Sequence, residues 1–130
     1  MSGIIELMLQ KKPFVSSGAV NERQIEEAEN KLGVKFSKEY KEYLLAFGTV
    51  SYYGHELTGV CVDDASINVV DVTLAERNFC TNIPEGWYVI EQTHMDGIVI
   101  WQDEQGCIYK AISGKIDKIH NSLKEYVAME

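Results

Sequence analysis

The segment NERQIEEAENKLGVKFSKEYKEYLLAFG, which runs from Asn21 to Gly48, predicts a hairpin of two helices. In the first helix Asn21 is placed to cap the N-terminus with Gln24 as its capping-box partner, and Gly33 can end the helix in the left-handed conformation. In the second helix Ser37 is the capping residue and Gly48 the terminating one. Both helices are therefore delimited by residues whose chemistry favours a helix boundary.

The spacing of apolar residues indicates which side of each helix is buried. They recur at intervals of three or four residues, as an amphipathic helix requires. These positions are Ile25, Ala28 and Leu32, then Tyr40, Tyr43, Leu44 and Phe47. We expect the tyrosines to pack in a core rather than to stack on bases or ligands. The first helix also carries glutamates that are expected mostly to face water, namely Glu22, Glu26, Glu27 and Glu29.

Further elements are predicted on both sides of the hairpin. Residues 4–8 predict a short amphipathic helix that Pro13 stops, and residues 16–18 predict a turn. Residues 55–62 predict a first strand. Residues 67–77 are ambiguous, because their β-branched run favours a strand while their second half favours a helix. We expect a strand followed by a short helix there.

The C-terminal part predicts an antiparallel meander followed by a helix. The runs WYVIEQT, GIVIWQ and CIYKAI are separated by turn candidates at residues 94–97 and 103–106. The middle run is apolar on both faces, so Ile98, Ile100 and Trp101 are expected in the core. A final helix begins after Asn121, and its apolar residues are Leu123, Tyr126 and Val127. The expected fold is α+β, with the N-terminal helices and the helix hairpin packed on a mainly antiparallel sheet and residues 1–130 forming a single domain.

The distribution of charge is the strongest functional signal. The 130 residues carry a net charge of −8, and the two ends are nearly neutral. Residues 54–109, which we call the acidic centre, hold ten carboxylates against Arg77 alone. Nucleic acid binding depends on lysine and arginine contacts to phosphate, so DNA and RNA are disfavoured as direct partners. A positively charged protein partner is favoured instead.

The sequence lacks the motifs that usually announce catalysis or a cofactor. No nucleophile elbow, phosphate-binding loop, dinucleotide fingerprint or zinc-protease motif occurs, so we expect no enzyme and no cofactor. A small hydrolase built from His55, His94 or His120 with Cys61 or Cys107 stays an alternative, because triad members need not be close in sequence. The odd number of separated cysteines, which includes Cys80, predicts buried thiols.

Other classes of site and location are also disfavoured. The acidic pairs at residues 63–64 and 103–104 resemble ordinary turns more than calcium sites, and no metal site is expected. No apolar run approaches the roughly 18 residues of a membrane span. The N-terminal lysines follow the apolar run, whereas a signal peptide carries its positive charge first. We therefore expect a cytoplasmic protein without a membrane or nucleic acid partner.

The order of these elements resembles the SUKH superfamily, the Smi/Knr-type domain, from about Asn21 to Val127. The resemblance rests on three groups of residues. They are Glu26 and Glu29 before Leu32-Gly33, Tyr40 to Leu44 before Gly48, and Ser122-Leu123 with Tyr126. The chain has Phe36-Ser37 where the family usually has a Leu-Pro pair, and serine can also start a helix.

The resemblance implies a bacterial immunity protein that binds and blocks a polymorphic toxin, often a nuclease. A regulatory or scaffold domain that docks on a signalling partner is the alternative. An acidic surface suits the basic substrate cleft of a nuclease and speeds association with it. The carboxylates predicted to contact the partner are Asp63, Asp64, Glu85, Glu91, Asp96, Asp103 and Glu104.

Overall fold

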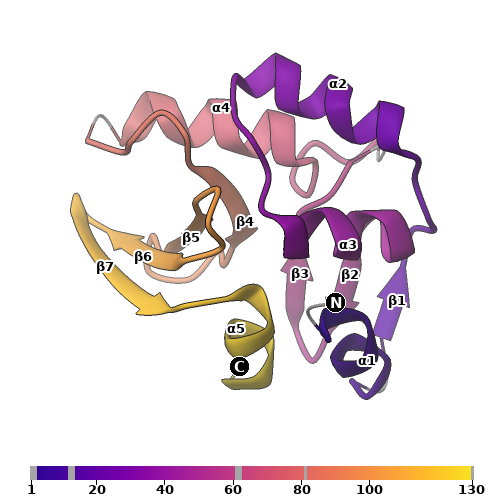
Figure 1. Cartoon of the computed structure of the whole chain (residues 1–130). Helices are drawn as coiled ribbons and strands as arrows, with labels where there is room; N and C mark the ends of the chain where they lie inside the picture. The colour runs from indigo at the N-terminus through magenta and orange to yellow at the C-terminus, as the bar shows by residue number, and fades with distance from the viewer. Residues whose placement is uncertain (1–2, 12–13, 61–62, 81, 130) are drawn as a thin grey trace.

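The structure, a computed structural model, describes residues 3–11, 14–60, 63–80 and 82–129. Over those residues the chain forms five helices and seven strands (Figure 1). In chain order they are α1 Ile4–Leu9, β1 Phe14–Ser16, α2 Glu22–Leu32, α3 Lys38–Phe47, β2 Val50–Tyr52, β3 His55–Leu57, α4 Val69–Phe79, β4 Tyr88–Gln92, β5 Val99–Gln102, β6 Ile108–Ile112, β7 Lys115–His120 and α5 Leu123–Met129. The strands form two antiparallel sheets, in the orders β1-β2-β3 and β4-β5-β6-β7. The predicted α+β class is confirmed.

The helix hairpin forms as the capping residues predict. The Asn21 side chain accepts a hydrogen bond from the Gln24 amide at 2.9 Å, and the Gln24 side chain accepts from the Asn21 amide at 3.0 Å. Gly33 has the left-handed φ of 69° that ends α2. The Ser37 hydroxyl accepts from the Tyr40 amide at 3.0 Å and so caps α3.

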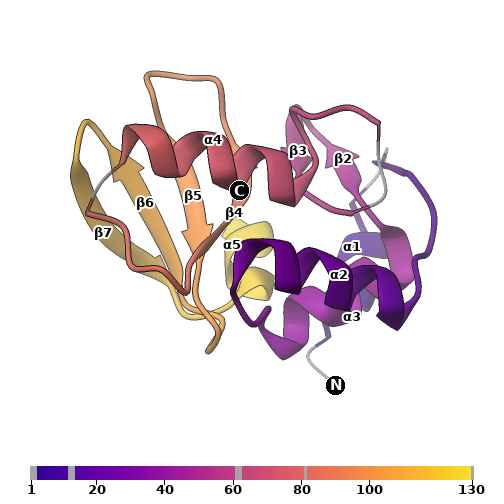
Figure 2. The ribbon, with the colours of Figure 1, turned by 90° about the horizontal axis from the view of Figure 1, so that it is seen from above.

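Two apolar clusters hold together the layers of helices and strands whose ribbons Figure 2 shows. The larger one packs α1, α2, α3 and α5 against one face of β4–β6 and against the β2-β3 hairpin. It contains Tyr40 and Tyr43, which are fully buried as predicted. The smaller one lies between α4 and the other face of the four-stranded sheet, and Trp101 is its largest buried residue. Both faces of the four-stranded sheet are therefore covered, as the doubly apolar β5 predicts.

The prediction of a strand before the helix in residues 67–77 is wrong. The helix α4 occupies Val69–Phe79, because the Asn68 side chain accepts hydrogen bonds from the amides of Val70 at 3.0 Å and Asp71 at 3.4 Å and caps it. Val69, Val72 and Thr73 then share one buried helix face. The β-branched residues are buried on a helix and not on a strand.

Other strand boundaries also differ from the predictions. Of the strand predicted at residues 55–62, residues 55–57 form the short β3, which pairs with β2, and residues 61–62 lie outside the described residues. After β3 the Thr58 amide donates to the Ile90 carbonyl at 2.9 Å instead. Ser16 ends β1 instead of opening a turn, and Pro13 lies outside the described residues. The meander has a fourth strand, β7, before the predicted C-terminal helix α5. Its exposed charges at Lys115, Asp117 and Lys118 concealed the strand pattern.

One glutamate of α2 is buried rather than facing water. Glu29 is 6% exposed, and its carboxylate accepts a hydrogen bond from the Phe36 amide at 2.8 Å. The same carboxylate lies 3.5 Å from the Lys41 ammonium. Glu29 therefore fixes the connection between α2 and α3, which explains why a charged side chain is tolerated there.

Candidate functional site

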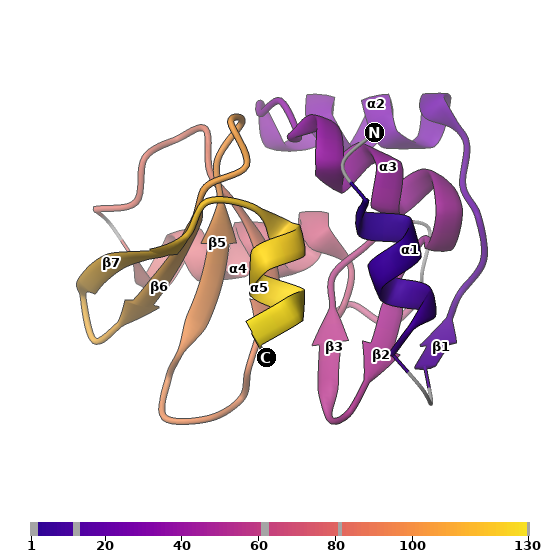
Figure 3. The same ribbon diagram turned by 60° about the horizontal axis from the view of Figure 1, so that its bottom comes forward.

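The seven carboxylates predicted to contact a partner lie in different environments. The exposed members are Asp63, Asp64, Glu85, Asp96 and Glu104. The pKa of Asp64 is lowered because its carboxylate accepts hydrogen bonds from the side chain and the amide of Ser66. Asp96 lies in the turn before β5 and Glu104 in the turn after it, so they occupy opposite ends of the sheet (Figure 3). The structure does not gather the seven residues into one patch.

Asp103 was predicted to lie exposed in the β5–β6 turn, but it is half-buried and its carboxylate holds that turn together. One carboxylate oxygen accepts a hydrogen bond from the Cys107 amide at 2.9 Å, and the other accepts from the Tyr109 hydroxyl at 2.8 Å. The Tyr109 ring stacks on Trp87 with centroids 3.8 Å apart. Asp103 thus holds the β5–β6 turn in shape, while its neighbour Glu104 projects into solvent.

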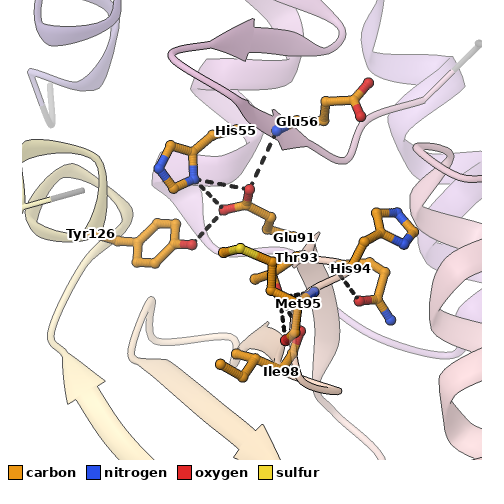
Figure 4. A network of polar contacts seen from close by, with 9 residues as sticks. His55, Glu56, Glu91, Thr93, His94, Met95, Ile98 and Tyr126 are labelled. Atoms are coloured by element: carbon orange, nitrogen blue, oxygen red, sulfur yellow. Dashed lines mark hydrogen bonds and ion pairs between the residues drawn. The ribbon is translucent and has the colours of Figure 1, made fainter.

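Glu91 is only 3% exposed, so a partner cannot contact this carboxylate in the folded chain, and its assignment to the partner-facing set is wrong. The carboxylate lies 3.0 and 3.2 Å from Nδ1 of His55 (Figure 4). It also accepts hydrogen bonds from the Glu56 amide at 3.3 Å and from the Tyr126 hydroxyl. Strand β3, strand β4 and helix α5 therefore meet at this one side chain.

A β-bulge places Glu91 in this position. The β4–β5 register shifts between Val89 and Glu91, which leaves Ile90 as an additional residue in β4. Val89 belongs to the smaller cluster below α4, and Ile90 belongs to the larger cluster on the other face. After the bulge Glu91 lies on the Tyr126 side, and Gln92 turns back to donate a hydrogen bond to Glu76 of α4 at 2.8 Å. Bulges commonly re-aim a side chain in this way.

Buried hydroxyl groups continue the polar contacts between the two sheets. Thr58 donates from its hydroxyl to the Val89 carbonyl at 2.8 Å and shares a hydrogen bond with the Tyr40 hydroxyl at 2.8 Å. The Tyr43 hydroxyl donates to the Thr58 carbonyl at 2.9 Å. Burial raises the pKa of both tyrosines, so they stay protonated donors. The junction of the sheets is thus hydrogen-bonded as well as apolar.

The His55–Glu91 pair has the form of a carboxylate-oriented imidazole. A proton on Nδ1 that is donated to Glu91 leaves Nε2 as the acceptor of a neutral ring. General-base catalysis would also require a substrate cavity at Nε2. Five of the best-formed hollows on the described residues contain no histidine in their lining. The pair is best understood as a structural tie between β3, β4 and α5.

Helix α5 is held at its start by a second carboxylate. Glu39 of α3 accepts hydrogen bonds from the amides of Leu123 and Lys124, the latter at 2.8 Å. The pKa of Glu39 is raised because burial of its carboxylate outweighs the stabilising effect of those two amides. The short helix α5 therefore docks through Glu39 at one end and through Glu91 one turn later.

A hollow of about 210 Å³ that no sequence motif indicates lies between α2 and α4. Glu27 and Asp71 line it together with Lys31 and Gln24, and Glu27 also pairs with Arg23 at 3.5 Å, so its lining carries both signs of charge. Glu27 and Asp71 are both exposed. The fold therefore places part of α2 beside the acidic centre, although the two are far apart in sequence. The acidic residues at helical spacing in α2 were the available signal.

Cysteines and metal ligands show no catalytic or metal arrangement in the described ranges. Cys80 and Cys107 are free and half-buried, so burial is less complete than predicted, and Cys61 lies outside the described residues. The pKa of the Cys80 thiol is raised by burial and by Glu76, which disfavours the reactive thiolate. Over the same ranges no group of three His, Cys, Asp or Glu residues could hold a metal ion. Nor does any described helix have the length and apolar character needed to cross a membrane.

Comparison with known proteins adds one decisive finding. The family model SUKH_5, described as SMI1-KNR4 cell-wall, matches residues 1–130. A search of curated proteins gave no match. The family match covers the capped hairpin, the two sheets and the α5 helix described above. The chain belongs to the SUKH family of SMI1-KNR4 proteins.

Proposed function

We propose that this chain is a cytoplasmic immunity protein that binds a basic toxin domain, such as a nuclease, and occludes its functional surface. Family membership supports a role in protein binding, and the net charge of −8 supports a basic partner. The proposal needs no catalytic group of this chain. Residues that could suggest catalysis, His55 and Glu91, are engaged in holding the fold.

The observation that carries the proposal is a set of exposed carboxylates without an internal role. Their side chains make no hydrogen bond or ion pair with the residues that the structure describes. They are Glu56, Asp63, Asp71, Glu85, Asp96 and Glu104. No hydrogen bond of the fold requires these six charges, since the internal contacts of the acidic centre use its other carboxylates, Asp64, Glu76, Glu91 and Asp103. Their negative field remains available to attract a basic protein.

The physical role of this field is to steer the encounter. Charges on several sides of the protein can speed association without all touching the partner, because at about 0.1 M salt the field reaches roughly 10 Å before it is screened. The bound immunity protein then blocks the toxin sterically. We therefore expect strong salt dependence of the association rate and weaker dependence of the dissociation rate.

The test uses a toxin domain encoded beside this gene. Co-expression should relieve its toxicity, and stopped-flow association should slow when salt is raised from about 0.1 to 1 M. Glu104→Lys should slow association more than Glu6→Lys, which makes the same charge change on exposed α1 outside the acidic centre. Toxicity that persists on co-expression, with association independent of salt, would contradict the proposal. Recovery of an endogenous signalling protein as the stable partner would support a regulatory scaffold instead.

A further inference from the structure

A hollow and a protruding aromatic ring lie close together at the C-terminal end of α4. The hollow has a volume of about 540 Å³ and lies where the ends of α2 and α4 face each other (Figure 2). Its lining includes Leu32, which is 4% exposed, and the half-buried Cys80 and Ile83. Phe79 directly precedes Cys80 and is 81% exposed, yet it is not part of that lining. We call Phe79 together with this hollow the α4-end surface.

The exposed side of α4 is more apolar than a surface helix requires. Val69 and Val72 are buried in the two apolar clusters, but Leu74 and Phe79 are large apolar residues exposed to 44% and 81%. A helix with one face in water normally carries polar residues on that face. The neighbouring helix α2 follows this rule, because all its exposed residues are charged or polar. The composition of α4 therefore indicates a contact beyond those of the folded chain.

Hydrogen bonds hold this end of the molecule in one shape. The Arg77 guanidinium donates to the Glu85 carbonyl at 3.2 Å. The Asn82 side-chain amide donates to the Gly114 carbonyl in the β6–β7 turn, also at 3.2 Å. Residues 82–85 are thus tied to α4 and to the four-stranded sheet. A molecule that docks here meets a hollow that is already formed, which lowers the entropic cost of binding.

The charges in the lining are complementary to a second copy of the same surface. Arg77 is the only lysine or arginine of the acidic centre, and it lines the hollow together with Glu85. The Glu85 carboxylate has no hydrogen bond or ion pair within the described part of the chain. In a dimer with two-fold symmetry every contact occurs twice, so Arg77 of each copy can face Glu85 of the other. A basic toxin would instead meet Arg77 as a repulsive charge.

We propose that the α4-end surface forms a symmetric dimer of this chain, in which Phe79 of each copy occupies the hollow of the other. A cavity of about 150 Å³ already accepts a benzene molecule, so the hollow has room for a phenyl ring. The proposal does not depend on the proposed function. The other exposed carboxylates without an internal role, such as Glu104, lie outside the lining and keep their steering role.

Salt separates this dimer from the complex with a toxin. Each copy carries a net charge of −8, so two copies repel each other over most of their surfaces. Raising salt from about 0.05 to 0.5 M screens this repulsion and should strengthen the dimer. Association with a basic toxin should slow over the same range. A dimer that weakens steeply with salt would contradict the proposed packing of Phe79 in an apolar hollow.

Sedimentation equilibrium of the purified chain measures the dimer without any toxin. At concentrations up to roughly 1 mM the average mass should rise from 14.7 kDa toward twice that value. Phe79→Ser should raise the dimer Kd by at least about 30-fold, because each dimer loses two buried rings. Leu9→Ser, which changes an exposed leucine of α1, should leave the Kd unchanged. A monomeric wild type, or equal Kd values for wild type and Phe79→Ser, would overturn the proposal.

Two charge reversals test the symmetric pairing of Arg77 with Glu85. Glu85→Arg sets arginine opposite arginine across the two-fold axis, and Arg77→Glu sets glutamate opposite glutamate. Each variant alone should therefore dimerise at least about 10-fold more weakly, whereas an equal mixture should associate as tightly as the wild type. Circular dichroism spectra that match the wild type confirm that both variants fold. A mixture that associates no better than either variant alone would refute the pairing.

The toxin provides the competing occupant of the α4-end surface. If the wild type forms no dimer and Phe79→Ser weakens toxin binding, the toxin occupies the surface and the proposal fails. A dimer that depends on Phe79 in a chain that neutralises no toxin would refute the proposed function and leave the dimer standing.

Discussion

Replacing Trp101 by alanine tests the smaller apolar cluster, on which the α4 side of the sheet depends. Trp101 is 0% exposed and packs with Val72, Val89, Val99 and Ala111. Truncating a buried Trp to Ala typically costs about 3–5 kcal/mol through lost contacts and cavity formation. The indole N–H is buried without a hydrogen-bond partner among the described residues. Leaving such a group unpaired costs about 1–3 kcal/mol, and Trp101→Ala removes this cost together with the indole. We therefore expect the free energy of unfolding to fall by about 3 kcal/mol, the lower end of the range for a buried Trp.

Trp101→Phe separates the two contributions. Phenylalanine retains much of the ring volume and removes the unpaired N–H, so we expect it to lose about 1 kcal/mol or less. Urea titration monitored by circular dichroism measures the free energy of unfolding of both variants. An m-value equal to that of the wild type would show that the variants expose the same amount of surface on unfolding, so that their free energies can be compared. A loss below about 1 kcal/mol for Trp101→Ala, or equal losses for both variants, would refute this account of the cluster.

Three further predictions concern packing, pH and the β5–β6 turn. Gly59→Ala should lower stability by more than about 2 kcal/mol, since its Cβ would lie 1.7 Å from the Gly48 carbonyl oxygen; thermal melting within a few degrees of the wild type would exclude this clash. The raised pKa of Glu39 means that the protonated carboxyl favours folding, so its contribution is present at low pH and is lost as pH rises through the folded-state pKa. Urea titrations should therefore show the wild type losing stability relative to Glu39→Gln as the pH rises above about 4, the usual range of a glutamic acid, and a difference that stays constant with pH would contradict it. Asp103→Ala should lose about 1–2 kcal/mol because its carboxylate accepts two hydrogen bonds, whereas Glu104→Ala should stay within about 0.5 kcal/mol; equal urea midpoints would argue against the structural role of Asp103.

The helices that could be predicted from sequence are those whose ends are marked by capping residues close by in the chain. Asn21 with Gln24, and Ser37 with Gly48, define α2 and α3 because each cap is satisfied by residues within one turn. The first part of α4 was predicted as a strand, and only a short helix was expected after it, although Asn68 caps the whole helix in the same way. Its β-branched residues favour a strand in isolation, and only burial of one helix face against β4 and β5 reverses that preference. Strand β7 lacks a clear apolar alternation because it is an edge strand with charged exposed positions.

The candidate site shows why charge counted along a sequence overestimates the charge that a partner meets. Periodicity alone would place Glu91 on the same face of β4 as Val89, and nothing local announces the bulge that turns it toward His55 and Tyr126. Asp103 has the composition of an exposed turn, yet its carboxylate is the acceptor that the turn needs. A carboxylate that is used internally is lost as a direct contact for a partner, but it supplies the hydrogen bonds that fix a junction or a turn. The internal bonds of Glu91 hold the start of β3, the end of β4 and helix α5 together, so this carboxylate joins three elements of the fold instead of facing a partner.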